Sequence, residues 1–424
     1  MRREAFFIAG RRRWCMRQGG GHEAVVEALL EAGASATVGE RGRDETLATV
    51  CMGHPTPGIV RRLVEAGADV NSSDGDRTAL INAAECGNVS VMEVLVELGA
   101  DLASADESGR TAMHAAATGE AVRLLVAHGL SVDGNDRGES PICKLSDDGR
   151  VDAVRALIEL GADVTCMDWY RWTPLHCAVR SFDEQVAVEL TRLLLAAGAD
   201  ARAVHTDDHA PLHCARYARC VGLLLDAGAD LEARNGESKT PLHHAVGLSE
   251  EEAVEATRAL LAAGADVHAA DNLGSTALHM AGDARCVRLL LDARASMEAR
   301  DWMGQTPLHR AVRRFKAVEI TRLLLAAGAD VHAVDGDGKT PLHCVYYAAC
   351  VDVLLDAGAD LEARDGEGET AIYTAATYRH NSRVEAVLRL ADLGTDPVNT
   401  GGEPGLVKCR VEELRAQRSR SHGV

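Results

Sequence analysis

Apolar residues recur along the chain in pairs of short helical segments, and residues 306–339 show the pattern most clearly. Thr306 stands at an N-cap position before a proline that suits the first helical position. Two apolar faces at helical spacing follow: Leu308, Ala311 and Val312, then Val318, Ile320, Leu323, Leu324 and Leu325. Gly328 ends the second helix, and the Asp-Gly-Asp-Gly segment 335–338 predicts a turn. The predicted unit is helix, loop, helix and protruding turn, and a single unit cannot bury its apolar faces.

The same unit starts again along most of the chain, at intervals of 29 to 37 residues. The starts are Thr46, Thr78, Thr111, Ser140, Thr173, Ala210, Thr240, Thr276, Thr306, Thr340 and Thr370. A degenerate unit that ends near residue 34 precedes them, which gives about twelve units. Because each repeat contacts mainly its neighbours, a chain of 424 residues need not divide into separate globular domains.

Two short motifs recur within the units. Thr-Pro-Leu-His-Cys-Ala stands at residues 173–178, with close variants from Thr240, Thr306 and Thr340, and Leu-Leu-x-Ala-Gly-Ala-Asp recurs before the turns. On these motifs the chain resembles the ankyrin-repeat protein family, over residues 12–399. The resemblance implies an all-α ankyrin-repeat solenoid of about twelve helix-turn-helix repeats with protruding β-turn tips.

We expect three segments. Residues 1–45 are read as a degenerate N-terminal capping repeat, residues 46–399 as the ankyrin-repeat array, and residues 400–424 as a short C-terminal helix and a disordered tail. The expected helix runs from Leu406 to Arg418. The first segment is rich in arginine, so a basic targeting or docking patch is the alternative to a cap.

From Thr173 onward, long and short repeats alternate, with lengths of 37, 30, 36, 30, 34 and 30 residues. Duplication of a two-repeat block is the simplest explanation. We expect the missing residues to fall between the two helices. Long repeats should then project a longer loop, as at 180–184 and 247–251.

Composition narrows the class of protein. A hydrophobic content of 46% with only 3% aromatic residues indicates a core of Leu, Ala and Val. The net charge of −19 argues against nucleic acid as a partner. The twelve cysteines lack the spacing of a disulfide framework, and no apolar run is long enough to cross a membrane. We therefore expect a monomer in a reducing compartment, the cytoplasm, with the nucleus as the alternative.

Known catalytic motifs are absent from the sequence. It contains no phosphate-binding loop and no GxSxG or HExxH motif. A histidine stands three residues after seven of the repeat starts, where the family uses it to stabilise the turn: His114, His176, His213, His243, His279, His309 and His343. The pairs Cys214–Cys220 and Cys344–Cys350 lack the spacing of a zinc site. We predict no catalytic residue, cofactor or metal, and an unrecognised enzyme site among Cys and His is kept as an alternative.

One predicted tip differs from the others. Most tips carry small or charged residues, but Trp169, Tyr170 and Trp172 stand together in the tip 168–172, in a chain with only four tryptophans. Exposed aromatic clusters are enriched among interface hot spots. Local packing against neighbouring tips is the alternative. Trp302 and Met303 repeat the feature four units later, and Arg171 occupies the usual glycine position, which could distort the tip.

A second candidate is the basic cluster of Arg310, Arg313, Arg314 and Lys316, which could attract an acidic peptide to an otherwise acidic protein. A solvated helix face is the alternative. Together these features predict a non-enzymatic scaffold that binds a protein partner on the concave surface formed by the tips and first helices, as the family resemblance implies. The alternative is a substrate-recognition adaptor of a ubiquitin ligase. Leu406, Cys409 and Leu414 resemble the ligase-recruiting box of some ankyrin-repeat proteins, although their spacing differs from it.

Overall fold

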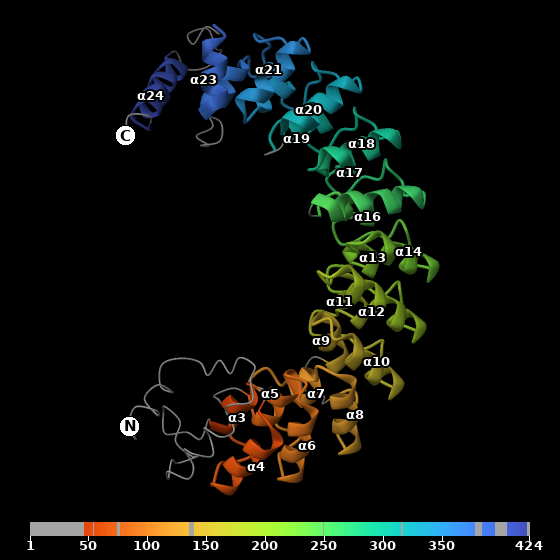
Figure 1. The fold of residues 1–424 in the computed structure, drawn as a ribbon. Coiled ribbons are helices and arrows are strands. Elements are labelled where there is room, and N and C mark those ends of the chain that lie inside the picture. The colour runs from red at the N-terminus through yellow and green to blue at the C-terminus, as the bar shows by residue number, and fades with distance from the viewer. Residues whose placement is uncertain are drawn as a thin grey trace. The chain divides into compact units, whose positions relative to one another are not determined.

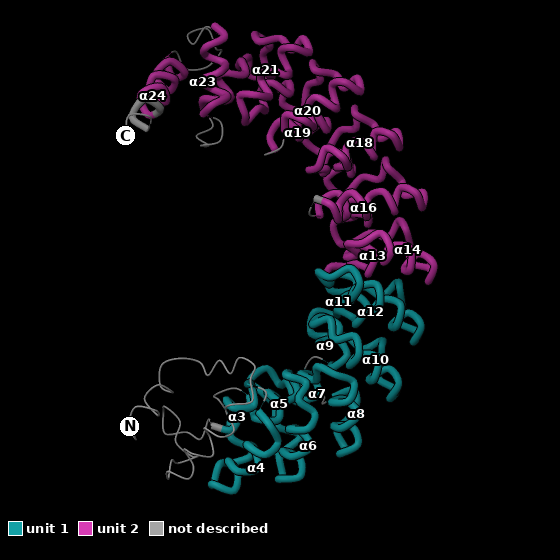
Figure 2. Tube along the Cα trace, viewed as in Figure 1, with its two compact units in different colours: residues 1–206 teal, residues 207–424 magenta. Residues whose placement is uncertain are grey.

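The computed structural model describes residues 46–53, 55–73, 77–134, 140–248, 250–314, 317–377, 384–394 and 405–421. The chain divides into two compact units, residues 1–206 and 207–424 (Figure 2). The described ranges contain helices and isolated β-bridges but no strand, so the all-α prediction is confirmed. The predicted cap 1–45 and Lys316 lie outside the described residues.

The first unit contains five described helix pairs (Figure 1). Its first helices are α3 (Thr46–Cys51), α5 (Ala79–Glu85), α7 (Ala112–Ala115), α9 (Pro141–Asp147) and α11 (Pro174–Val179). Its second helices are α4 (Pro57–Glu65), α6 (Val89–Glu97), α8 (Gly119–Ala127), α10 (Val151–Glu159) and α12 (Glu184–Ala196). First helices pack on first helices and second helices on second helices, so the repeats stack in register.

The second unit contains six helix pairs and a terminal helix. Its first helices are α13 (Pro211–Cys214), α15 (Pro241–Ala245), α17 (Ala277–Met280), α19 (Pro307–Ala311), the 3-10 helix η1 (Pro341–Cys344) and α22 (Ala371–Thr377). Its second helices are α14 (Ala218–Asp226), α16 (Glu250–Ala262), α18 (Ala284–Asp292), α20 (Ala317–Ala326), α21 (Ala348–Asp356) and α23 (Val384–Asp392). The chain closes this stack with α24 (Leu406–Ser421).

The core of each unit lies in the seam between the two rows of helices. The leucine two residues after each Thr-Pro start is buried, as Leu175 and Leu308 illustrate, and each second helix contributes a buried leucine such as Leu194 or Leu324. Gly328 ends α20 with a φ of 100°, the left-handed conformation expected at a helix C-terminus. The apolar pattern read from the sequence is thus the pattern of burial.

The difference between long and short repeats was predicted only in part. In the long repeat that starts at Thr173, the second helix has 13 residues, against 9 in the short repeat that follows, and the first helix has 6 against 4. The loop between the helices has four residues in the long repeat and three in the short one. Most of the extra length therefore extends the helices, because added helical turns bury more apolar surface than a longer loop would.

The segment near the C-terminus packs against the last repeat. Helix α24 contacts α22 and α23 and buries Val407, Val411 and Leu414. It continues to Ser421, three residues beyond the end that we expected. In the part of the chain that the structure describes, no helix combines the length and the apolar character needed to span a bilayer.

Candidate protein-binding surface

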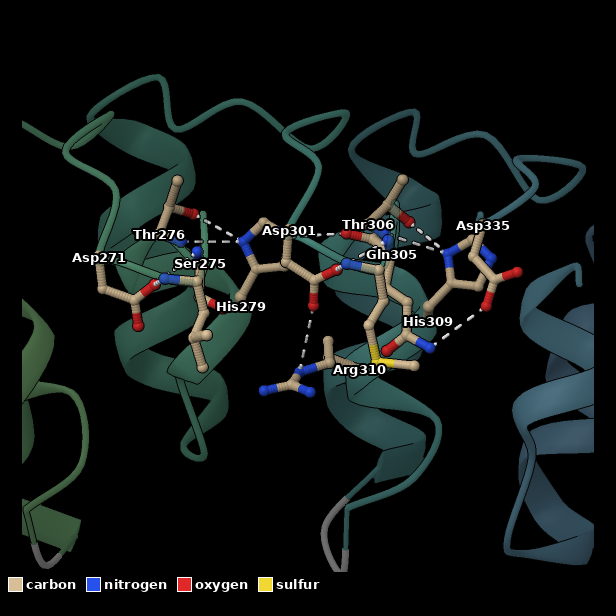
Figure 3. A network of polar contacts seen from close by, with 12 residues as sticks. Asp271, Ser275, Thr276, His279, Asp301, Gln305, Thr306, His309, Arg310 and Asp335 are labelled. Carbon is tan, nitrogen blue, oxygen red and sulfur yellow. Dashed lines mark hydrogen bonds and ion pairs between the residues drawn. The ribbon is translucent and has the colours of Figure 1, made fainter. Parts of the chain in front are cut away.

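The tips that begin with aspartate are closed turns held by that residue. In the tip 301–305, Asp301 Oδ1 accepts the backbone N–H groups of Met303 (3.0 Å) and Gln305 (2.9 Å) (Figure 3). The Asp301 N–H donates to the carbonyl of Gln305 (3.0 Å) and closes the turn. The same bonds recur at Asp168, Asp271, Asp335 and Asp365. One carboxylate therefore fixes the backbone that presents the tip side chains.

Neighbouring tips of the second unit are joined to one another. Trp302 N–H donates to the carbonyl of Leu273 (2.8 Å), and Gly336 N–H donates to the carbonyl of Met303 (2.7 Å). The next tip makes the equivalent bond, from the Gly366 N–H to the carbonyl of Asp337 (2.8 Å), so the tips form a continuous row. The row gives the exposed tip residues fixed spacing before any partner arrives.

In the second unit, five repeat histidines connect their start to the following repeat: His213, His243, His279, His309 and His343. In the repeat from Thr276, His279 Nδ1 accepts the Thr276 N–H (3.1 Å), and His279 Nε2 lies 3.0 Å from the carbonyl oxygen of Gln305, 26 residues later (Figure 3). Because Nδ1 accepts a backbone N–H, the proton must be on Nε2, which donates to Gln305. Burial lowers the pKa of His279, as it does for His309 and His343.

The contact of the histidine with the start of its own repeat was predicted from its position three residues after that start. The bond to the next repeat was not, because the sequence alone does not show which carbonyl the stacking brings to Nε2. The histidines are thus buried, neutral structural groups within the stack.

The predicted aromatic tip splits into an outward and an inward part. Trp169 and Tyr170 are 74% and 67% exposed. The half-buried Trp172 stacks on His205, with ring centroids 4.6 Å apart, and the Arg180 guanidinium lies 4.7 Å from the centre of its ring. Trp172 therefore follows the alternative interpretation, local packing against a neighbouring tip. Trp169 and Tyr170 lie in the turn itself, and Trp172, which follows the turn, faces His205 of the next tip.

Arg171 does not distort this tip. Its φ of 61° places it in the left-handed region that Gly304 and Gly338 occupy in their tips, and Arg171 N–H still donates to the carbonyl of Asp168 (2.9 Å). An arginine in this conformation costs about 1 kcal/mol relative to glycine. The turn bonds of Asp168 retain the tip geometry despite that cost.

The second aromatic position lies in the tip row of the second unit. Trp302 is 68% exposed, and the exposed Leu273 is adjacent to it through the bond between their tips. Met303 is half-buried. Trp302 and Leu273 therefore form a small apolar pair at the solvent face of the row.

The basic cluster is not a solvated helix face. Arg310 Nε lies 3.9 Å from the buried Asp301 Oδ2 (Figure 3). Arg313 donates to the Tyr346 hydroxyl (3.1 Å) with its guanidinium over that ring, and Arg314 donates to the carbonyl of His279 (3.0 Å). All three arginines are half-buried and contact neighbouring repeats. The sequence did not predict these contacts, because Arg313 and Arg314 follow the recurring Thr-Pro-Leu-His motif in a loop whose sequence varies between repeats.

In one tip, the first residue donates side-chain hydrogen bonds where the aspartates of other tips accept them. Asn235 takes the place of the usual tip aspartate, and its Oδ1 accepts the N–H groups of Glu237 (3.0 Å) and Lys239 (2.9 Å). This fixes the amide so that Nδ2 points to Nε2 of His209 (3.0 Å) and of His244 (3.1 Å). Near the tips with aspartate, the residues at the positions of His209 and His244 carry donors instead: Gln305 beside Asp335, and Arg310 beside Asp301. Here the donor is Asn235 and the acceptors are the two histidines.

The repeated helix pairs, the hydrogen-bonded tips and the inter-repeat histidines define a helical repeat protein with a tip-lined surface. The family model of ankyrin repeats (3 copies) matches residues 14–106, 47–136, 98–168, 182–271, 249–335 and 315–400. The chain belongs to the ankyrin-repeat family, as the sequence motifs predicted.

Among solved structures, the chain is similar to one titled "Crystal structure of the ankyrin repeat domain of Bcl-3: a unique member of the IkappaB protein family". The identity is 32%, the alignment covers 51% of this chain and 99% of that one, and the TM-score is 0.42. No curated protein matches the chain. Ankyrin repeats generally mediate protein–protein interaction, and proteins built from them are typically non-enzymatic scaffolds; the comparisons indicate no catalytic family.

Proposed function

We propose that this protein is a non-enzymatic scaffold that docks a protein partner on the exposed aromatic pair Trp169 and Tyr170. The observation that carries the proposal is their exposure on a turn whose backbone is fixed by Asp168 and whose base is packed by Trp172. Preorganised aromatic side chains lose little entropy on binding, and truncation of such an anchor typically costs ~2 kcal/mol or more of binding free energy. Trp302, Met303 and Leu273 form the corresponding contact in the second unit.

Arg314 supports a further contact with an acidic side chain of the partner. Its guanidinium lines a cavity of about 180 Å³ together with Met280, Gly282 and Asp283. Burial lowers the pKa of Arg314, and among the described residues no carboxylate is within ion-pair distance of it. Asp283 is already bound by Arg285. Arg310 and Arg313 would contribute mainly by holding this region, because each is engaged within the stack.

The test is a crosslinked pull-down from a native lysate, with wild type compared with Trp169→Ala/Tyr170→Ala. Phe182→Ala is the matched control, because Phe182 is 86% exposed in the same repeat but lies in the loop between the helices. Specific proteins that are captured by wild type and by the control, but lost with the double variant, support docking at the tip. Identical captured sets from all three proteins would rule the aromatic pair out.

The ubiquitin-ligase adaptor remains the alternative function. It needs α24 to contact ligase subunits, yet α24 uses Val407, Val411 and Leu414 to pack on the last repeat. Leu406 and Cys409 stay exposed and are the residues that could make such a contact. Ligase subunits that co-purify with wild type and are lost with Leu406→Ala/Cys409→Ala would favour the adaptor over a simple scaffold.

A further inference from the structure

The repeat that starts at Ser140 carries a cysteine at the position of the repeat histidine. Cys143 stands three residues after Ser140, at the position that His114, His176 and five further histidines hold in other repeats. Cys143 Sγ lies 3.8 Å from the carbonyl oxygen of Trp172, the residue directly before the next start. His279 contacts the corresponding carbonyl of Gln305. Cys143 therefore retains the inter-repeat contact of the histidine with a smaller side chain.

A second cysteine fills the space that the smaller side chain leaves. Cys166 stands seven residues before Thr173, where the later repeats have alanine: Ala203, Ala233, Ala269, Ala299, Ala333 and Ala363. The Ala233 carbonyl hydrogen-bonds to His213, and Cys143 Sγ lies 4.0 Å from the Cys166 carbonyl in the same way. The pair His and Ala is thus replaced by Cys and Cys, and the two Sγ atoms lie 3.7 Å apart.

We propose that Cys143 and Cys166 are a modification site that closes to a reversible disulfide when a peroxide oxidises them. A disulfide needs the two sulfurs about 2.05 Å apart. From 3.7 Å, they must approach by about 1.7 Å. Both residues lie in the first unit, Cys143 in α9 and Cys166 in the segment that leads into the aromatic tip.

The surroundings assign different roles to the two sulfurs. The two sulfurs are within hydrogen-bond distance of each other, and this contact lowers the pKa of Cys166 and, together with burial, raises the pKa of Cys143. Cys166 is also the more exposed of the two. Cys166 is therefore the residue that peroxide reaches first, since the thiolate is the nucleophile.

The chemistry balances with one peroxide molecule. The Cys166 thiolate attacks a peroxide oxygen and forms a sulfenic acid, and the departing hydroxide takes up the proton that Cys166 released, giving water. Cys143 sulfur then attacks the Cys166 sulfur, and the sulfenic hydroxyl leaves with the Cys143 proton as a second water. The two sulfurs are oxidised, the peroxide oxygens are reduced, and an external dithiol reverses the reaction.

The bond would act on the aromatic tip. Oxidation removes the Cys143 hydrogen and with it the hydrogen bond of Cys143 to the Trp172 carbonyl. The disulfide also links α9 covalently to Cys166, two residues before Asp168. The expected consequence, altered presentation of Trp169 and Tyr170 to a partner, rests on the proposed function. Formation of the disulfide does not.

The test treats the full-length protein with stoichiometric hydrogen peroxide and maps its peptides without reduction. We expect a linked Cys143–Cys166 peptide that dithiothreitol separates. Cys166→Ala should lose the linkage. The control Cys143→His/Cys166→Ala installs the residue pair of the other repeats, so it should fold with unchanged circular dichroism while lacking the bond. Recovery of Cys143 and Cys166 unlinked while other cysteines oxidise, or linkage of either one to Cys177 instead, would overturn the proposal.

The binding consequence has a separate readout. Pull-downs with the oxidised and the reduced wild type, and with the His/Ala control under both conditions, compare captured partners. A change that is confined to wild type supports control of the tip by the disulfide. A disulfide that forms without any change in captured partners refutes only that control, whereas the absence of any specific partner in the reduced state refutes the proposed function.

Discussion

Trp172 stacks on His205 with ring centroids 4.6 Å apart and an angle of 13° between the ring planes. The contact joins the aromatic tip to the next tip of the first unit, and Arg180 covers the tryptophan ring at 4.7 Å. Trp169, three residues earlier, is exposed to solvent. Two tryptophans of one turn thus have different tasks, one in packing and one at the surface.

We expect Trp172→Ala to lower the free energy of unfolding by about 2 to 3 kcal/mol, because it removes a half-buried ring and the stacking contact of that ring with His205. Trp169→Ala should change it by less than about 0.5 kcal/mol, since the side chain is largely in water. Urea unfolding of the two variants measures the difference. Equal destabilisation would contradict the division between the two rings.

The repeat pattern allowed most of the fold to be predicted. The Thr-Pro starts, the buried leucines and the helix-ending Gly328 follow from local periodicity and capping, which act within one repeat. The lengths of the helices in the long repeats were not predicted, because a short polar segment of sequence is compatible with either a loop or an added helical turn.

The site was less predictable than the fold. Exposure of Trp169 and Tyr170 followed from their place in a tip, whereas burial of Trp172 depends on His205, 33 residues later. Arg313 and Arg314 likewise find their partners in neighbouring repeats. Such contacts depend on stacking geometry, which residue spacing within one repeat does not encode. The same holds for the pairing of Cys143 with Cys166.

Substitutions in one repeat test the helix register. Leu324 is buried in α20, so Leu324→Asp places an unpaired charge in the seam and should cost more than about 4 kcal/mol of unfolding free energy. Pro307→Gly should cost about 1 kcal/mol, mainly through the greater entropy of the unfolded chain. The exposed Arg322→Asp on the same helix is the control and should have little effect. Similar melting temperatures for the Leu324 and Pro307 variants would contradict the register.

The buried histidines predict a loss of stability in acid. Burial lowers the pKa of His213 from 6.5 to about 4, and burial with the charges of His209, His213 and Lys239 lowers that of His244 to about 3. Because the unfolded chain binds these protons first, stability is complete above pH 6.5 and falls as the pH drops toward 4 and 3. Each histidine contributes a slope of at most about 1.4 kcal/mol per pH unit.

Unfolding in urea at a series of pH values measures that slope. His244→Gln keeps a hydrogen-bond acceptor for Asn235 but does not titrate, so its slope should be smaller than that of wild type. His332→Gln, an exposed site, is the matched control. An unchanged slope in His244→Gln would mean that the acid sensitivity comes from other groups.

The tip of Asn235 gives the sharpest prediction. Asn235 directs its N–H groups at Nε2 of both His209 and His244, and the bonds of its Oδ1 to Glu237 and Lys239 prevent the amide from turning over. Protonation of either histidine at Nε2 would place two donors face to face. The replacement Asn235→Asp keeps the turn bonds and offers both rings a carboxylate oxygen, which Asp335 offers to Gln305 and Asp301 to Arg310. We therefore expect Asn235→Asp to raise the pKa of His244, measured by a side-chain NMR titration, and to reduce the loss of stability in acid. Asp271→Asn, in the following tip, is the control for a change of charge alone. A His244 pKa that stays the same or falls in Asn235→Asp would show that burial, and not the orientation of the Asn235 amide, keeps this ring neutral.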